Sequence, residues 1–284
     1  MHTKLRFSLI IGTLALIGSA AASAAPVLFS GSGATAAGIQ TTVDAFRSSL
    51  GTLNPNVAGS FGSGRREINW DGVPDAQSAP NNLAANFFNA NSPRGVVLST
   101  PGTALQVSAN LASGTAVEFG NINATYPGLF ATFSPQRLFT ALGSTITDVN
   151  FFVPGTNLPG FITAFGSVFT DVDLANISSL QFFDLNNNSL GTFFVPAFTG
   201  NETLSFLGVQ FNAGERVGRV RITSGNQILG ANETGDLVVM DDFIYAEPLS
   251  VPEPATLLLM LVSLIALIVI RTRRSQRFDQ VRVA

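Results

Sequence analysis

Cysteine is absent from this chain of 284 residues, and histidine and lysine occur once each, as His2 and Lys4. Without cysteine the protein has no disulfide framework, no thiolate-bound zinc, no iron–sulfur cluster and no thiol nucleophile. Charged residues make up only 12% of the chain, about half of the usual share. The hydrophobic share of 46% argues against a disordered chain. The formal net charge of −3 argues against nucleic acid as a partner.

The first 24 residues have the composition of a secretory signal peptide. A basic start is followed by an apolar run over 7–17 and then by small residues. Ala22 and Ala24 satisfy the small-x-small rule, so cleavage is expected between Ala24 and Ala25. The apolar run is too short for a signal anchor that stays in the membrane. Cleavage would remove the chain's one histidine and its one lysine.

Residues 251–284 have three parts in order: a proline-rich motif over 251–254, an uncharged apolar run over 255–270 and a basic tail over 271–284. A helix over the apolar run spans about 24 Å of a hydrocarbon core about 30 Å thick. The arginines place the tail on the cytoplasmic side and the bulk of the chain outside the inner membrane. The motif residues and the first arginines of the tail are Val251, Pro252, Glu253, Pro254, Arg271, Arg273 and Arg274.

This order of motif, apolar run and arginines resembles the PEP-CTERM sorting signal of Gram-negative bacteria. The resemblance implies recognition by an exosortase, a membrane-embedded protease that cuts near the motif. It further implies a transient inner-membrane anchor, followed by release to the cell surface or the exopolysaccharide matrix. The alternative is an ordinary C-terminal transmembrane anchor that is never cut. The chain lacks Leu-Pro-x-Thr-Gly, so a Gram-positive sortase route is not supported.

The exported part between these segments, 25–250, is acidic. It holds eight arginines, no lysine and sixteen aspartates and glutamates, which gives it a net charge of −8. The basic residues that moderate the whole-chain charge therefore lie in the two targeting segments.

A mostly β fold is expected for 25–250. A short helix is expected over 41–51, and short strands separated by turn residues follow from about Gly95 onward. This pattern predicts a single antiparallel β-sandwich, jelly-roll-like, with short N-terminal helices. The 24 phenylalanines of the chain would fill its core. The alternation of apolar residues changes phase at Gly208, which predicts a β-bulge there.

Three segments of the exported part, 164–173, 205–209 and 239–243, resemble those of uncharacterised exported bacterial β-sandwich proteins, loosely like galactose-binding jelly rolls. The resemblance implies glycan or surface association and no enzymatic activity.

The missing residue types also make catalysis unfavourable. After signal cleavage no histidine, cysteine or lysine remains for a catalytic triad, a Schiff base or an imidazole metal site. No Gly-x-Ser-x-Gly sequence is present. We therefore expect a protein that is not an enzyme. The alternative is a glycan hydrolase that uses two carboxylates facing each other across a cleft.

Calcium is the cation that the acidic residues favour, as a structural ion rather than a catalytic cofactor. The best candidates are Asp241 and Asp242, although regular strand geometry would point them to opposite faces. Asp171 and Asp173 form a second acidic pair. The oxygen-rich segment 184–189 is better explained as a polar hairpin turn.

Glycan binding would need an exposed aromatic ring. Trp70 precedes a turn at Asp71-Gly72 and is the candidate for stacking on a sugar. A single tryptophan is more commonly a core residue. The sequence as a whole predicts an exported surface or matrix protein with a structural, adhesive or glycan-binding role.

The sorting prediction has a direct readout in the mature protein. Mass spectrometry of the surface-located form is expected to find a C-terminus near 252–254, because the cut separates the apolar run from the exported part. Recovery of that form with Ala284 still attached would contradict processing and favour the uncut anchor.

Overall fold

The computed structural model describes residues 24–230, 234–251, 259–260, 262–268 and 271. Within these ranges most regular elements are strands, and every pairing between two strands is antiparallel. The prediction of a mostly β fold with few helices is confirmed. The finer jelly-roll topology stays a prediction.

The strands form two large sheets and a small one among the described residues. The first sheet contains, in spatial order, β1 (Val27–Gly33), β11 (Leu204–Gln210), β8 (Ala164–Thr170), β13 (Val239–Ala246), β5 (Phe139–Leu142) and β4 (Ala104–Val107), with β2 (Arg65–Ile68) also paired to β13. The second sheet contains β10 (Ser189–Phe194), β9 (Ser179–Asp184), β12 (Val217–Thr223), β6 (Ile146–Phe151) and β3 (Val96–Ser99). The small sheet pairs β7 (Gly160–Phe161) with β14 (Leu249–Ser250).

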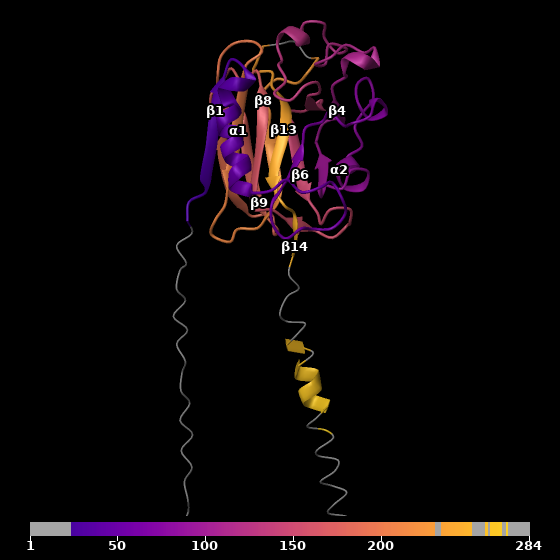
Figure 1. The fold of residues 1–284 in the computed structure, drawn as a ribbon, viewed down its shortest axis with the longest axis vertical. Coiled ribbons are helices and arrows are strands. Elements are labelled where there is room, and N and C mark those ends of the chain that lie inside the picture. Colours follow the sequence, from indigo (N-terminus) through magenta and orange to yellow (C-terminus); the bar gives the residue numbers. More distant parts are fainter. Residues whose placement is uncertain (1–23, 231–233, 252–258, 261, 269–270, 272–284) are drawn as a thin grey trace, which may run out of the picture.

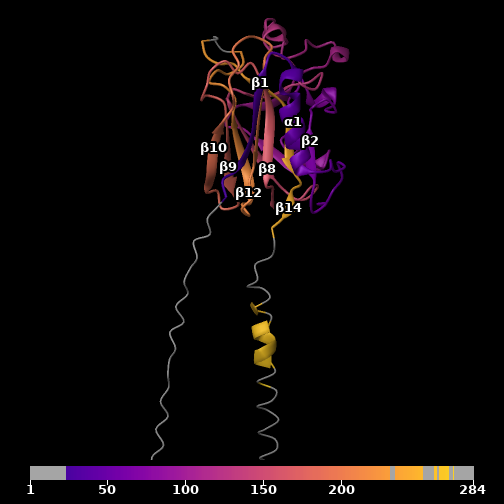
Figure 2. The same ribbon diagram turned by 60° about the vertical axis from the view of Figure 1, so that its left-hand side comes forward.

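The described body also contains two α-helices and three short 3-10 helices, and the described residues 259–260, 262–268 and 271 near the C-terminus are helical as well. The helices of the body are α1 (Ala36–Leu50), α2 (Phe87–Ala90), η1 (Asp75–Gln77), η2 (Leu111–Ser113) and η3 (Tyr126–Gly128). The expected helix over 41–51 is present as α1, which begins earlier than the sequence indicated. Figures 1 and 2 show α1 lying along the outer face of the first sheet, beside β1.

The main core lies between the two large sheets. Phe165 and Phe243 from the first sheet meet Phe151 and Phe182 from the second in one cluster of buried side chains. A second, smaller core lies under α1, on the other face of the first sheet. The central strand β8 is consequently buried along its whole length.

Helix α1 is seated by Phe46, which packs over two glycines on neighbouring strands. Gly208 of β11 pairs directly with Gly166 of β8. A Cβ atom on Gly208 would lie 2.8 Å from the Phe46 ring, and one on Gly166 would lie 2.9 Å from it. These distances are too short for two carbon atoms in contact. The two glycines therefore form a recess for the Phe46 ring, which a side chain at either position would fill.

The bulge expected at Gly208 is absent, which corrects that prediction. β11 stays in register with β8 from Leu204 to Gln210. The phase change has another cause: both faces of β11 are buried. Leu204 and Phe206 lie in the core under α1, whereas Leu207 and Val209 lie in the core between the sheets. Gly208 interrupts the alternation because Phe46 occupies the space of its side chain.

Both ends of the sandwich chain lie at the same pole of the molecule. Figure 1 shows the start of β1 and the end of β14 at the lower end. Ala24 and Ala25, at the predicted signal cleavage point, are exposed and precede β1. Ala22 and the rest of the predicted signal peptide lie outside the described residues.

Most of the predicted sorting segment also lies outside the described residues, including Pro252, Glu253, Pro254, Arg273 and Arg274. Val251 is described and is 39% exposed, and Arg271 is described and exposed. Among the residues that are described, no helix has the length and apolar character needed to cross a membrane.

The recess beneath Phe46 leads to a stability prediction. Gly208→Ala is expected to lower the free energy of unfolding by about 1–3 kcal/mol, because the added methyl group meets the Phe46 ring. Urea denaturation followed by circular dichroism would measure the change.

Gly128→Ala is the matched control. A Cβ atom at Gly128 would meet no atom within 4 Å, so this variant should unfold like the unmodified protein. Equal stability of the two alanine variants would contradict the packing role given to Gly208.

Candidate functional site

A β-bulge in β13 brings two acidic side chains to one side of the first sheet. The register of β13 on β8 shifts between Met240 and Phe243. Asp241 and Asp242 occupy the shift, and both carboxylates reach the hydroxyl of Ser134. The opposite orientation expected for a regular strand does not apply here, because a bulge interrupts the alternation of side chains.

Asp241 is fully buried and anchors the loop that precedes β5. Its Oδ2 atom accepts hydrogen bonds from the backbone N–H groups of Phe133, at 2.6 Å, and Ser134, at 3.1 Å. Burial raises the pKa of Asp241 well above its usual range, and the neighbouring Asp242 carboxylate adds to the rise.

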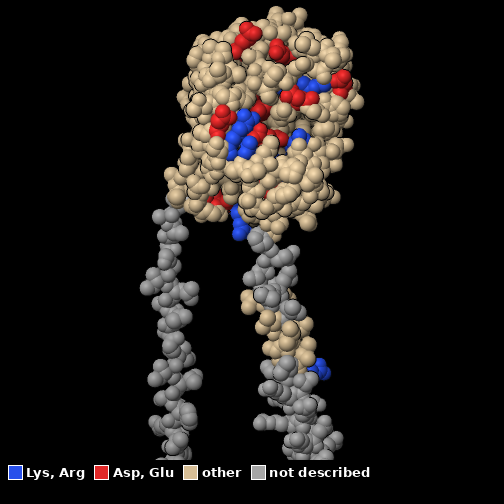
Figure 3. Space-filling model, viewed as in Figure 1, with Lys and Arg blue, Asp and Glu red and all other residues tan. Residues whose placement is uncertain are grey.

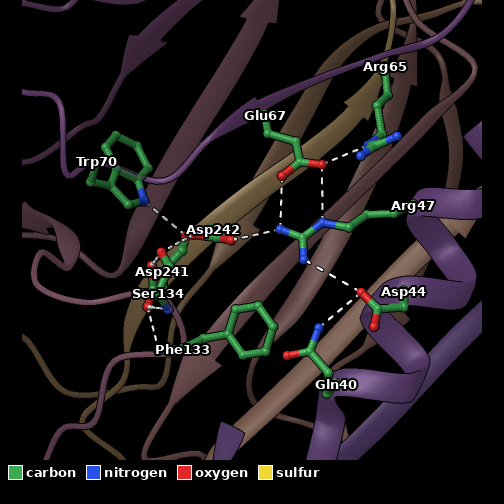
Figure 4. A network of polar contacts seen from close by, with 10 residues as sticks. All are labelled: Gln40, Asp44, Arg47, Arg65, Glu67, Trp70, Phe133, Ser134, Asp241 and Asp242. Atoms are coloured by element: carbon green, nitrogen blue, oxygen red, sulfur yellow. Dashed lines mark hydrogen bonds and ion pairs between the residues drawn. The ribbon is translucent and has the colours of Figure 1, made fainter. Parts of the chain in front are cut away.

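Arg47 connects α1 to this pair of acids (Figure 4). Its Nη2 atom donates to Glu67 of β2 at 2.8 Å and to Asp242 at 3.1 Å, and its Nε donates to Glu67 at 3.1 Å. Arg65 binds the same Glu67 carboxylate at 2.6 Å. Asp242 is buried, which raises its pKa, while its hydrogen bond from Ser134 and the charge of Arg47 oppose the rise. The network therefore joins α1, β2 and β13 through charged hydrogen bonds.

A pocket of about 290 Å³ opens beside this network and is called the polar pocket below. Charged groups gather in the middle of the face shown in Figure 3. The lining residues are Arg47, Leu53, Asn54, Asn56, Glu67, Asn69, Arg94, Ser134 and Asp242. A smaller pocket of about 230 Å³ shares Asn69 and Arg94 with it. The volume lies at the lower end of the range for small-molecule sites.

Trp70 lies behind the polar pocket, in the core. It is 1% exposed, and its ring stacks on Phe139 with centroids 4.2 Å apart. Its Nε1 atom donates to the backbone carbonyl of Asp241 at 2.9 Å. This burial corrects the expectation that Trp70 stacks on a sugar, because phenylalanine rings pack around it. Its indole N–H is therefore bonded to the backbone of the bulge.

Acidic residues that are close in the sequence are separated by the fold. Asp71 accepts the backbone N–H groups of Gln136 and Arg137, and Asp75 pairs with the Arg137 guanidinium. The oxygen-rich segment after Asp184 is the tip of the β9–β10 hairpin, where Asp184 accepts backbone hydrogen bonds. That segment is a turn, as its composition indicated.

The described part of the chain contains no group of three or more acidic, histidine or cysteine side chains positioned to hold a metal ion. Beside Asp242, the guanidinium of Arg47 stands where a cation would bind. Calcium at Asp241 and Asp242 stays a prediction.

A second acidic group lies where β8 ends. Asp171 has a φ of +67°, and its buried Oδ1 has no hydrogen-bond partner among the described residues. Burial raises the pKa of Asp171 to about 7, and the charges of Asp173 and Asp236 contribute. Those two carboxylates are bound by backbone N–H groups, for example that of Gly200 on Asp173 at 2.7 Å. Asp171 is therefore a carboxyl group that keeps its proton in the folded protein below about pH 7.

This shift predicts a pH dependence of stability. Between about pH 4 and pH 7 the folded protein keeps a proton on Asp171 that the unfolded chain releases. The free energy of unfolding should therefore fall as the pH rises through this interval, by up to about 1.4 kcal/mol per pH unit. Asp171→Asn should remove that contribution, since asparagine tolerates a positive φ and does not titrate. Urea titrations at several pH values would measure the slopes.

Asp184→Asn provides the comparison. Hydrogen bonds from Asn188 lower the pKa of this exposed carboxylate, so its replacement should leave the slope above about pH 5 unchanged. An Asp171→Asn variant with the slope of the unmodified protein would refute the assignment.

Sequence reasoning identified Asp241 and Asp242 and missed Arg47, Ser134 and Arg94. Arg47 is 20 residues from Glu67 and 195 from Asp242 along the chain, so no local motif links them. The one available signal was the helical pattern of α1, which places Arg47 beside the buried Phe46.

Comparison with known protein families finds a match at the C-terminus of the chain. Residues 250–274 match the PEP-CTERM protein-sorting motif. No curated protein matches the chain. Among solved structures, the chain is similar to the enzymatically active domain of tailspike protein 4 of bacteriophage CBA120, with 14% identity and a TM-score of 0.24 over 59% of this chain and 21% of that one. So weak a likeness carries no argument about fold or function.

The sequence match confirms the resemblance drawn from the prolines, the apolar run and the arginines. It implies processing by an exosortase, and proteins with this motif are exported and sorted to the cell surface. The chain carries a C-terminal PEP-CTERM protein-sorting motif over residues 250–274, behind a β-rich body, and this motif implies processing by an exosortase.

Proposed function

We propose that the exported body is a non-catalytic protein of the cell surface or exopolysaccharide matrix, and that it binds glycan in the polar pocket. The sorting motif supports the location. The contents of the pocket support the kind of ligand, because its lining combines charged groups with asparagine amides. Guanidinium groups, carboxylates and amides are planar and present paired donors or acceptors, which suit adjacent hydroxyl groups of a sugar.

The observation that carries the non-catalytic role is the engagement of the acids. Glu67 receives hydrogen bonds from Arg47 and Arg65, and Asp242 receives them from Arg47 and Ser134. A carboxylate whose oxygens are already bound by a guanidinium is a poor nucleophile, because those oxygens are engaged in charged hydrogen bonds. These groups are arranged to hold the pocket together.

The rim of the pocket provides groups that are available for a ligand. Asn56 and Asn69 are exposed, and no described residue shares a hydrogen bond with either side chain. Each amide offers two donor hydrogens and one acceptor oxygen. A sugar ring at the rim would therefore meet polar groups that water now solvates.

A carboxylate-dependent glycan hydrolase is the second candidate. Glu67 and Asp242 both contact Nη2 of Arg47, at 2.8 and 3.1 Å. The Glu67 and Asp242 oxygens that bind this atom are therefore no farther apart than the sum of the two distances. That limit is compatible with the spacing of about 5 Å between the two carboxyl groups of retaining glycosidases. This spacing supports hydrolysis, whereas the ion pairs with Arg47 argue against it.

One experiment separates the two candidates. The full chain in detergent micelles is incubated with exopolysaccharide from the producing cells, and both co-sedimentation and new reducing ends are measured. Binding without new reducing ends is expected. Asn69→Ala should weaken binding by about 3- to 10-fold, because it removes hydrogen bonds worth about 0.5–1.5 kcal/mol.

Asn186→Ala is the matched control, because Asn186 is an exposed asparagine in a turn remote from the polar pocket in sequence. The hydrolase would be established instead if the unmodified protein produced new reducing ends and both Glu67→Gln and Asp242→Asn abolished them. Absence of binding and of hydrolysis would refute both candidates.

A further inference from the structure

Arg94 differs from the other arginines around the polar pocket because it lacks an acidic partner. Among the residues described, its guanidinium makes no ion pair, and its buried Nε atom has no hydrogen-bond partner. Its Nη1 atom donates to the hydroxyl of Ser92. The guanidinium lies over the ring of Phe88, 5.2 Å from its centroid. Arg94 is thus a positioned cation without a counter-charge.

The surroundings of Arg94 make this cation unusual. Burial lowers the pKa of Arg94, and the positive charge of nearby Arg66 contributes. Arg66 is itself paired with Glu247 at 2.7 Å, so that carboxylate is already bound. The hydroxyl of Tyr245 donates to the backbone carbonyl of Arg94 and not to its side chain. Partial burial of an unpaired charge is costly, and proteins usually offset it with a partner.

The charges around the polar pocket point to an anion as that partner. Arg47 and Arg65 are paired with the carboxylates of Glu67 and Asp242, and Asp44 lies 3.8 Å from Arg47. Arg94 is therefore the pocket-lining arginine whose charge no described carboxylate meets, within a body whose net charge is −8. A ligand with a negative charge would pair with Arg94, and a single charge limits its repulsion by the carboxylates of Glu67 and Asp242 that line the same pocket.

We propose that Arg94 binds the carboxylate of an acidic sugar residue, such as a hexuronate, in the polar pocket. The inference rests on the proposed glycan-binding function and names its ligand class. The planar guanidinium matches a planar carboxylate. Arg94 lines both pockets, and Asn69 lines both with it. The sugar ring would lie across this shared wall, with its hydroxyl groups toward Asn56 and Asn69.

The test is calorimetric titration of the full chain in detergent micelles with three probes. The probes are a trimer of galacturonic acid, the neutral trimer of galactose, and that neutral trimer carrying sulfate esters. The acidic trimer is expected to bind more tightly than the neutral one. Arg94→Gln should weaken binding of the acidic trimer by about 10- to 100-fold, as expected for hydrogen bonds to a charged group.

Arg216→Gln is the matched control. Arg216 also lies over an aromatic ring, at 5.1 Å from the centroid of Phe161, and it is exposed outside the pocket. Its replacement should leave the affinity unchanged. Arg94→Lys retains the charge and loses the planar fork, so it should bind with intermediate affinity even if Arg94→Gln folds poorly.

The possible outcomes are distinguishable. If the acidic and neutral trimers bind equally and neither Arg94 variant changes the affinity, the role of Arg94 is refuted and glycan binding stands. If the sulfated trimer binds as tightly as the acidic one with the same dependence on Arg94, the assignment to a carboxylate is refuted. If no trimer binds, this inference and the proposed function fail together.

Discussion

The position of α1 on the first sheet depends on two adjacent residues. Phe46 enters the recess over Gly166 and Gly208, and Arg47 carries charge from the helix to Glu67 and Asp242. The packing contact determines how closely the helix approaches the sheet. Only at that distance does the next side chain reach the bulge in β13. The polar pocket therefore depends on a contact between an aromatic ring and a pair of glycines.

The bulge in β13 is the second requirement. It brings Asp241 and Asp242 to one side of the sheet. Both carboxyl groups are buried there, so each needs partners within the protein. Backbone N–H groups satisfy Asp241, and Arg47 balances Asp242. Breaking such a buried pair costs more than forming it contributes, because the remaining charge stays buried. This asymmetry explains why the network is completely connected.

The result is a cationic position within an acidic protein. The arginines of the body other than Arg94 and Arg216 form ion pairs with described carboxylates. Where sixteen acids accompany eight arginines, an arginine without an acidic partner is unexpected. Its location in a pocket makes it the most informative residue for the identity of a ligand.

The sequence by itself determined the sorting segment, the acidic charge of the body, the short helix and the mostly β class. These properties follow from composition, local order and periodicity, which neighbouring residues specify. Only the tertiary structure decided that Trp70 is a core residue, that Gly208 lies in a regular strand, and that Asp241 and Asp242 share one side of the sheet. Those outcomes depend on contacts between residues far apart in the chain, such as Arg47 with Asp242, and local patterns do not encode them.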